Sequence, residues 1–234
     1  MSDKLNRRNM LMAAGAGVAS ASILGSGAQS ADAAPGCCKK KLSFCNSDFY
    51  VDGEFSVEKG KDAIIALMKY HGYPVYPNIR ETLWVSDYNT GEFTKLGLAA
   101  NMWMNNVEDR YMLMDLFLLP GQMLPEHWHL EAEGNPAKRE GWLVRHGMSY
   151  IVGIGEPNLP KEIVIPKCHM GGKVTTEHCT ITKPGEFVPL AEVGTRHWQW
   201  GGPEGAIITE VANVHTDSAV RHSDPEMNKY FLGG

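Results

Sequence analysis

The sequence lacks an excess of positive charge. Its 234 residues include 22 lysines and arginines against 27 aspartates and glutamates, which gives a net charge of -5. No basic surface is available to displace counterions from a phosphate backbone, so nucleic acid is not an expected partner. The body of the chain also lacks repeats and low-complexity tracts, and its length favours one folded domain with appended segments.

A long unbroken apolar run is missing as well. The apolar stretch at residues 10–28 is interrupted by glycine and serine, whereas a membrane-spanning helix needs about 20 strongly apolar residues. The stretch follows Arg7-Arg8 and precedes Ala31-Asp32-Ala33, small residues that suit a leader peptidase. This order predicts a twin-arginine export signal over residues 1–33, a periplasmic or otherwise exported mature protein, and no membrane anchor after cleavage.

Cysteine is scarce, and the number of cysteines is odd, so no disulfide pairing follows from the sequence. Cys37, Cys38 and Cys45 lie close together after the predicted cleavage region, whereas Cys168 and Cys179 lie far downstream. An oxidising compartment would permit one bridge among the first three.

Residues 56–71 have the pattern of one amphipathic helix, which Gly72 ends. The apolar residues that recur at helical spacing are Val57, Ile64, Ile65 and Met68. We interpret residues 34–55 as a linker or extension and residues 56–234 as a single domain.

After residue 81 the pattern changes to short apolar or alternating runs separated by turn signals. The runs are residues 83–85, 111–119, 142–144, 150–154 and 207–211, and the turn signals are residues 89–91, 120–121, 171–172 and 184–185. Strands do not alternate with helices in this region, which disfavours a doubly wound sheet. The sequence therefore predicts an all-β barrel over about residues 81–222, preceded by one helix.

His127 and His129 flank a single residue, Trp128. Because side chains alternate along a strand, both imidazoles point to one face and can reach a common metal ion at about 2.1 Å. Glu140 follows after a short segment, and His197 stands alone much later. Three histidines and a carboxylate make a mixed nitrogen and oxygen site for one divalent ion. Mn, Fe, Zn, Co and Ni all suit such ligands, and affinity order alone does not select among them.

The order of these residues resembles the two cupin motifs. A glycine, five residues, a His-x-His pair and a later glutamate match the first motif, and Gly194-Thr195-Arg196-His197 matches the second. The resemblance implies a double-stranded β-helix, or jelly-roll barrel, with the ligands inside.

Glu133 is a rival to Glu140 as the carboxylate ligand. It stands at the shorter spacing from His129 that cupins in general prefer. Six residues separate Glu140 from Gly147, and this glycine also fits the motif, which favours Glu140.

A longer part of the chain, covering most of residues 56–222, resembles D-lyxose isomerases. The similar segments are residues 85–88, 92–98, 124–129, 138–140 and 208–211. The resemblance implies Mn as the metal and a catalytic pair formed by Lys138, two residues before the glutamate, and Glu210, in the last core strand. It implies as metal ligands His127, His129, Glu140 and His197. We also expect a homodimer and a small-molecule sugar substrate.

The chemistry of an aldose–ketose isomerase explains these residue types. Moving the carbonyl of a sugar such as lyxose or mannose between C1 and C2 requires a proton to leave one of these carbons and a proton to add to the other, through an enediol. A chelated metal polarises the carbonyl, Glu210 is expected to carry the carbon-bound proton, and Lys138 to manage protons on oxygen. The chain departs from the family in an insertion at residues 131–137, on the rim of the site, and in its predicted export.

Two other functions would use the same ligands. An oxygenase-type cupin needs the metal site but not Lys138 or Glu210, and a noncatalytic carbohydrate-binding cupin would use the metal only to anchor its ligand. Metal analysis and a sugar assay separate the three hypotheses.

Other aromatic residues and histidines are expected to be structural. Core packing is the interpretation for Trp128, Trp142, Trp198 and Trp200. No role is assigned to the histidines without ligand-type spacing, His71, His146, His169, His178 and His222. His215 and Asp217 follow the strand of Glu210 closely enough to border the cavity, where either can hydrogen-bond a polar substrate.

Overall fold

A computed structural model of the protein describes residues 41–232. The predicted export signal, the first residues of the expected linker, and Cys37 and Cys38 lie outside the described residues. Cys45, Cys168 and Cys179 are free thiols. No helix within residues 41–232 combines the length and apolar character needed to cross a membrane.

Part of the expected linker belongs to the folded body. A helical turn, η2 (Asn46–Phe49), leads into a small hairpin of β1 (Tyr50–Val51) and β2 (Glu54–Phe55). The ring of Phe49 is buried and lies 4.8 Å from that of Phe93. The aromatic side chains of this segment need cover from water, which explains why it packs on the barrel instead of forming a linker.

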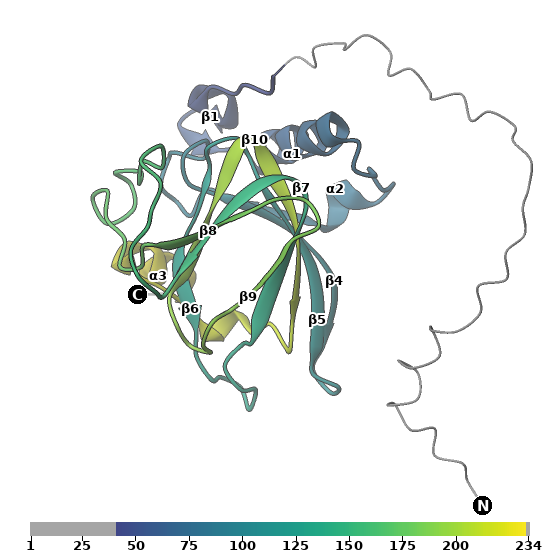
Figure 1. Cartoon of the computed structure of the whole chain (residues 1–234). Helices are drawn as coiled ribbons and strands as arrows, with labels where there is room; N and C mark the ends of the chain where they lie inside the picture. Colours follow the sequence, from purple (N-terminus) through teal and green to yellow (C-terminus); the bar gives the residue numbers. More distant parts are fainter. Residues whose placement is uncertain (1–40, 233–234) are drawn as a thin grey trace, which may run out of the picture. The chain divides into compact units, whose positions relative to one another are not determined.

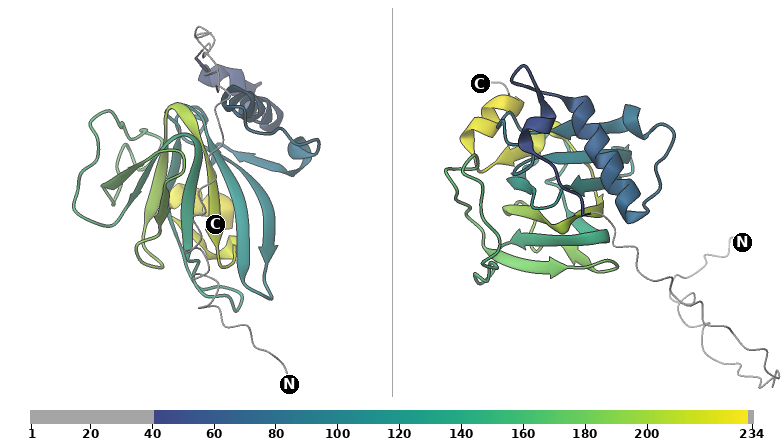
Figure 2. Two further views of the ribbon diagram at one scale, coloured as in Figure 1. Left: turned by 45° about the vertical axis from the view of Figure 1, so that its right-hand side comes forward. Right: turned by 90° about the horizontal axis from the view of Figure 1, so that it is seen from above.

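Helix α1 (Val57–His71) occupies the predicted range. The Ser56 side chain accepts a hydrogen bond from the Lys59 N–H at the start, and Gly72 adopts a left-handed conformation at the end. Ile64, Leu67 and Met68 pack against outward-facing side chains of the sheet. Figure 2 shows the helix lying outside the curled strands. The short α2 (Ile79–Thr82) then leads into the barrel.

Nine antiparallel strands form the barrel, which confirms the predicted cupin jelly roll (Figure 1). In chain order they are β3 (Leu83–Ser86), β4 (Leu98–Asn106), β5 (Tyr111–Leu118), β6 (Met123–His129), β7 (Glu140–Gly153), β8 (His178–Thr182), β9 (Phe187–Pro189), β10 (His197–Ala212) and β11 (Val220–His222). The turn η3 (Asp217–Ala219) precedes β11, and helix α3 (Pro225–Leu232) follows it.

Two long strands join the two halves of the barrel. Residues 206–212 of β10 pair with β5, residues 197–200 of the same strand pair with β6, and β7 runs along its other edge. Strands β3, β4 and β5 therefore lie in one sheet and β11, β6 and β8 in the facing sheet, with β7 and β10 passing through both. His197, at the start of β10, and Glu210, near its end, are thus both brought into the barrel interior.

Strand β7 is continuous where the sequence predicts two separate strands, residues 142–144 and 150–154. The bend between them lies at Gly147, whose φ is +70°. A Cβ atom there would stand 2.1 Å from the carbonyl oxygen of Gly205, so this close approach of β7 to β10 requires glycine. The strand turns through this point from one sheet into the other without ending.

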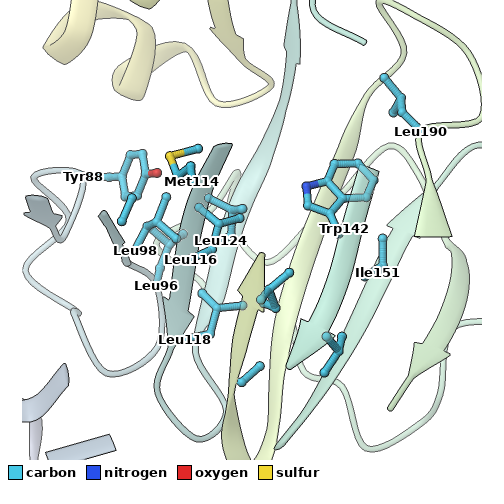
Figure 3. Close-up of a cluster of buried hydrophobic side chains, with 14 of the residues drawn as sticks. Tyr88, Leu96, Leu98, Met114, Leu116, Leu118, Leu124, Trp142, Ile151 and Leu190 are labelled. Atoms are coloured by element: carbon cyan, nitrogen blue, oxygen red, sulfur yellow. The ribbon is translucent and has the colours of Figure 1, made fainter. Parts of the chain in front are cut away.

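Apolar side chains fill part of the barrel interior. Figure 3 shows Trp142 and Ile151 of β7 across the interior from Leu98 and Leu116 of β4 and β5. Leu98 and Leu116 also line the cavity that contains the candidate site.

Candidate metal centre and active site

Three histidines from two distant segments meet inside the barrel. His127 and His129 lie on the interior face of β6, and His197 begins β10 directly opposite His127. One ring nitrogen from each of these three residues lies within 4.8 Å of the others. All three side chains are buried. The strand pairing therefore produces the convergence of imidazoles that the sequence spacing predicts.

Glu140 completes this cluster. It is the first residue of β7, and its Oε1 lies 3.2 Å from Nε2 of His129 and 3.3 Å from Nε2 of His197. Glu133 lies instead on the rim, where its Oε1 accepts a hydrogen bond of 2.6 Å from the Ser218 hydroxyl. The geometry thus favours Glu140 over Glu133 as the carboxylate partner of the histidines.

The donor atoms of the cluster fit a metal cation. Nδ1 of His127 donates to the Pro125 carbonyl at 2.9 Å, and Nδ1 of His197 donates to the Thr195 carbonyl at 3.0 Å. Because Nδ1 carries the proton, Nε2 of each ring keeps a free lone pair. Nε2 of His129, Nε2 of His197 and Oε1 of Glu140 are buried without a hydrogen-bond partner. Buried polar atoms without partners are costly unless a ligand engages them.

The charge states of these groups also suit a cation. Burial lowers the pKa of His127 and His197, and it lowers the pKa of His129 to about 4, so the imidazoles are neutral at pH 7. Burial alone would raise the pKa of Glu140, but Lys138 and the nearby imidazoles outweigh it and hold that pKa well below its usual range. Three neutral imidazoles and one carboxylate are a donor set for a borderline divalent metal.

Lys138 and Glu210 lie side by side next to this cluster. The Nζ of Lys138 forms ion pairs with Glu210 Oε1 and, at 3.0 Å, with Glu140 Oε2. The indole N–H of Trp142 donates to Glu210 Oε2 at 3.1 Å. Lys138 follows the insertion at residues 131–137, and Glu210 lies in the second half of β10. The insertion therefore leaves the two predicted catalytic side chains in contact.

Each member of this pair shifts the pKa of the other. Burial alone would lower the pKa of Lys138, but the carboxylates of Glu140 and Glu210 outweigh it and raise that pKa, so the ammonium stays charged. Burial raises the pKa of Glu210, and the Lys138 charge opposes part of this rise. A buried carboxyl group with a raised pKa beside a permanent cation is suited to proton transfer.

The pair and the metal cluster open onto a cavity of about 700 Å³. Its lining combines the polar residues His127, His129, Lys138 and Glu210 with many apolar side chains. The cavity is also lined by His215 and Asp217, as the sequence predicts; Nε2 of His215 lies 2.9 Å from Asp217 Oδ1.

One histidine without a predicted role also lines this cavity. The side chain of His222 is buried, and its ring lies 5.9 Å from the ring of His127. It comes from β11, whose pairing with β6 places His222 opposite His127. No spacing to another ligand marks this residue in the sequence.

The other histidines and the tryptophans differ in their surroundings. His169 is a buried structural residue, with Nδ1 hydrogen-bonded to the Lys173 carbonyl and Nε2 accepting from the Glu126 N–H. Trp128 points away from the site and carries the Arg196 guanidinium over its ring at 4.3 Å. Trp198 packs in a separate buried cluster. Trp142 is a core residue that also holds Glu210, a contact that sequence analysis missed.

Together, the fold and the site define a cupin with a candidate metal centre inside its barrel. Among solved structures, L-ribose isomerase from Cellulomonas parahominis matches 72% of this chain and 91% of its own, with a TM-score of 0.52 and 13% identity. At this identity the likeness shows the fold alone. No family model matches the chain.

Curated relatives identify the family within this fold. A D-lyxose ketol-isomerase from Cohnella laeviribosi is 30% identical over 173 residues, which cover 73% of this chain and 92% of that protein. A D-lyxose/D-mannose isomerase from Thermosediminibacter oceani is 30% identical over 175 residues, covering 74% of this chain and 93% of that protein. The chain belongs to the D-lyxose isomerase family, and it is an aldose–ketose isomerase.

Proposed function

We propose that this isomerase interconverts D-lyxose and D-xylulose, or D-mannose and D-fructose, with one divalent metal ion. His127, His129, Glu140 and His197 would hold the ion, and the family resemblance favours Mn. The names of the curated relatives support these sugars. The observation that carries the proposal is the buried contact between Lys138 and Glu210 beside the candidate ligands.

The proton transfers follow from the positions of these two side chains. The Glu210 carboxylate removes the proton from C2 of the aldose, the electron pair of that C–H bond forms the C1–C2 double bond, and the π pair of the C1 carbonyl moves to O1. A proton then passes from O2 to O1, the C2 carbonyl forms, and the same carboxyl group returns a proton to C1. The Lys138 ammonium donates a hydrogen bond to the oxygen on which negative charge develops. When bound, the metal supplies Lewis-acid polarisation of the carbonyl and orients two sugar oxygens.

The neighbours of the pair hold it in place for this role. Trp142 binds one oxygen of Glu210 and Lys138 contacts the other, so the carboxylate has a defined orientation. Glu140 contacts the histidines through Oε1 and Lys138 through Oε2. One carboxylate thus links the candidate metal ligands to the acid–base pair. An oxygenase-type reaction needs neither Lys138 nor Glu210, so it does not account for their contact beside the candidate metal ligands.

Deuterium exchange tests the proposed reaction. The purified, metal-loaded protein is incubated with D-lyxose and D-mannose in deuterated water, and NMR follows deuterium at C2 of the aldose and C1 of the ketose. Glu210→Gln should lower the rate by about 10²- to 10⁴-fold at an unchanged metal content. Glu131→Gln, a change to an exposed carboxylate on the same rim, is the control and should match the wild type. Full exchange and isomerisation in Glu210→Gln would contradict the proposal.

We also propose that the protein works outside the cytoplasm. The paired arginines, the interrupted apolar stretch and the small residues before Ala34 support export through the twin-arginine pathway.

A further inference from the structure

His222 lies in the same cross-strand row as two candidate metal ligands, His127 and His197. His222 on β11 lies opposite His127 on β6, and His127 lies opposite His197 on β10. The ring centroids of His127 and His197 are 4.3 Å apart, whereas those of His127 and His222 are 5.9 Å apart. His222 lies outside the cluster whose nitrogens converge within 4.8 Å. It is therefore displaced by one strand from the metal centre, about 4.8 Å along the sheet.

Within residues 41–232, the buried Nδ1 of the His222 imidazole has no hydrogen-bond partner. Its side chain lines the cavity and the residue is only 5% exposed, yet Nδ1 is buried and unpaired. The backbone, in contrast, is held at both ends by Asn228: the His222 N–H donates to Asn228 Oδ1 at 2.7 Å, and Asn228 Nδ2 donates to the His222 carbonyl at 2.7 Å. A rigidly held, unpaired polar ring in a cavity wall is suited to a ligand group.

Two aromatic rings stand beside His222 in the same wall. The ring of Tyr88 lies 5.4 Å from that of His222, the ring of Phe231 lies 5.5 Å from it, and the two are 5.3 Å from each other. All three residues line the cavity. The His222 imidazole and the Tyr88 hydroxyl group, set among aromatic ring surfaces, match an open-chain sugar, in which hydroxyl groups project from a carbon chain with apolar C–H faces.

We propose that His222, with Tyr88 and Phe231, forms a subsite for the part of the sugar beyond C2, and that the imidazole binds the C4 hydroxyl group. The proposal rests on the proposed function, because that function fixes C1 and C2 beside Lys138 and Glu210. From C2, two carbon–carbon bonds of about 1.5 Å each, the hydroxyl oxygen and its hydrogen bond together reach beyond the spacing of about 4.8 Å between neighbouring strands. His222 is thus a substrate-binding residue that selects sugars by the groups distal to the reacting carbons.

Two variants separate hydrogen bonding from packing. H222F keeps a ring against Tyr88 and Phe231 but removes the hydrogen-bonding nitrogens, whereas H222Q restores a polar group. H222F should raise KM for D-lyxose and D-mannose by about tenfold to a hundredfold and change kcat by less than about threefold. H222Q should recover part of the loss in KM. The metal content by elemental analysis and the thermal midpoint Tm should match those of the wild type.

Substrate analogues identify the contacted hydroxyl group. A 4-deoxy sugar should be a poor substrate for the wild type and an equally poor one for H222F, because the group that His222 binds is missing. Equal KM values of the wild type and H222F for D-lyxose, or loss of the metal in H222F, would overturn the subsite.

A binding measurement keeps this test independent of turnover. The alditol obtained by reducing D-lyxose is titrated by calorimetry into the metal-loaded wild type and H222F. Affinity that falls about tenfold in H222F supports the subsite even if the wild type turns over no aldose, a result that would defeat the proposed function alone. Equal alditol affinities would overturn the subsite while leaving the isomerase proposal in place.

Discussion

At the scale of single residues, Glu140 has the greatest influence on the site. Its two oxygens face different partners: Oε1 lies near the imidazoles of His129 and His197, and Oε2 lies 3.0 Å from Lys138 Nζ. A change at this residue therefore affects both the metal centre and the acid–base pair, whereas a change at the rim carboxylate Glu133 should affect neither.

Glutamine substitutions at the two rival carboxylates test which one binds the metal. E140Q removes the negative charge and one anionic donor from the cluster, so metal affinity should fall by about a hundredfold or more. E133Q alters only a side chain bonded to Ser218 and should keep its metal. Elemental analysis after dialysis against a weak chelator gives the comparison. Full occupancy in E140Q with loss in E133Q would reverse the assignment.

Lys138 and Glu210 should contribute unequally to stability. In the metal-free protein, K138M leaves the carboxylates of Glu140 and Glu210 buried without a counter-charge, which costs about 3–5 kcal/mol in the free energy of unfolding. E210Q leaves the ion pair of Lys138 with Glu140 intact, so its cost should be about 1 kcal/mol or less. Urea unfolding of both variants measures the difference, and equal losses would show that Glu140 does not depend on Lys138.

At the scale of elements, the bends of the long strands decide the shape of the barrel. Gly147→Ala would force a Cβ atom against the Gly205 carbonyl at a residue with φ of +70°. The free energy of unfolding should fall by about 3 kcal/mol or more. Gly91→Ala is the matched control, because its φ is +71° with nothing within 4 Å of the added atom, and strain alone costs about 1–2 kcal/mol. Similar losses in urea unfolding would rule out the clash.

A buried carboxylate on the outer face of β6 fixes the segment between β7 and β8. Glu126 is fully buried and accepts hydrogen bonds of 2.8 and 2.9 Å from the backbone N–H groups of Thr176 and Thr175, and further bonds from both hydroxyl groups. Burial alone would raise its pKa, but these hydrogen bonds to the ionised form lower it below the ordinary value of 4.5. The ionised form therefore stabilises the protein above about pH 4.5, and this contribution is lost as the pH falls through the folded-state pKa.

The variant E126Q should reveal this contribution. It should lower the free energy of unfolding at pH 7 by about 1–3 kcal/mol and reduce the loss of stability between pH 7 and acid conditions. The exposed Glu177 of the same segment supplies the control E177Q, which should match the wild type. Urea unfolding at several pH values is the measurement, and an unchanged pH profile in E126Q would contradict the argument.

The elements also show what sequence alone could predict. Helix α1 was predictable because its cap at Ser56, its apolar spacing and its final Gly72 are all local signals. The strands and turns were predictable for the same reason. The continuity of β7 was not, because it depends on contact between Gly147 and Gly205, which are far apart in the sequence. Strand β11 has three residues and is defined by its pairing with β6, so the position of His222 depends on a contact that no local pattern contains.

At the scale of the whole molecule, the candidate site depends on the closure of the barrel. Its candidate metal ligands come from β6, β7 and β10, and Lys138 and Glu210 lie in segments that meet only when β10 pairs with β7. The spacing of the candidate ligands and the family resemblance predicted which residues meet, because the His-x-His pair, the glutamate and the late histidine follow the order of the cupin motifs. The part of the cavity wall formed by Tyr88, His222 and Phe231 was not predicted, since no motif or ligand-type spacing relates these residues and they meet only in the folded chain.

Because such a site exists only in the folded chain, export by a pathway that carries folded proteins suits this molecule. Changing Arg7-Arg8 to Lys-Lys keeps the charge of the segment but removes the paired arginines on which the predicted signal depends. The full-length variant should stay in the cytoplasm of the exporting host with its signal uncleaved, while the wild type and a control with Lys4→Arg reach the periplasm at the mature length. Cell fractionation with immunoblotting distinguishes these results. Periplasmic protein of mature length in the Lys-Lys variant would show that the paired arginines do not direct export.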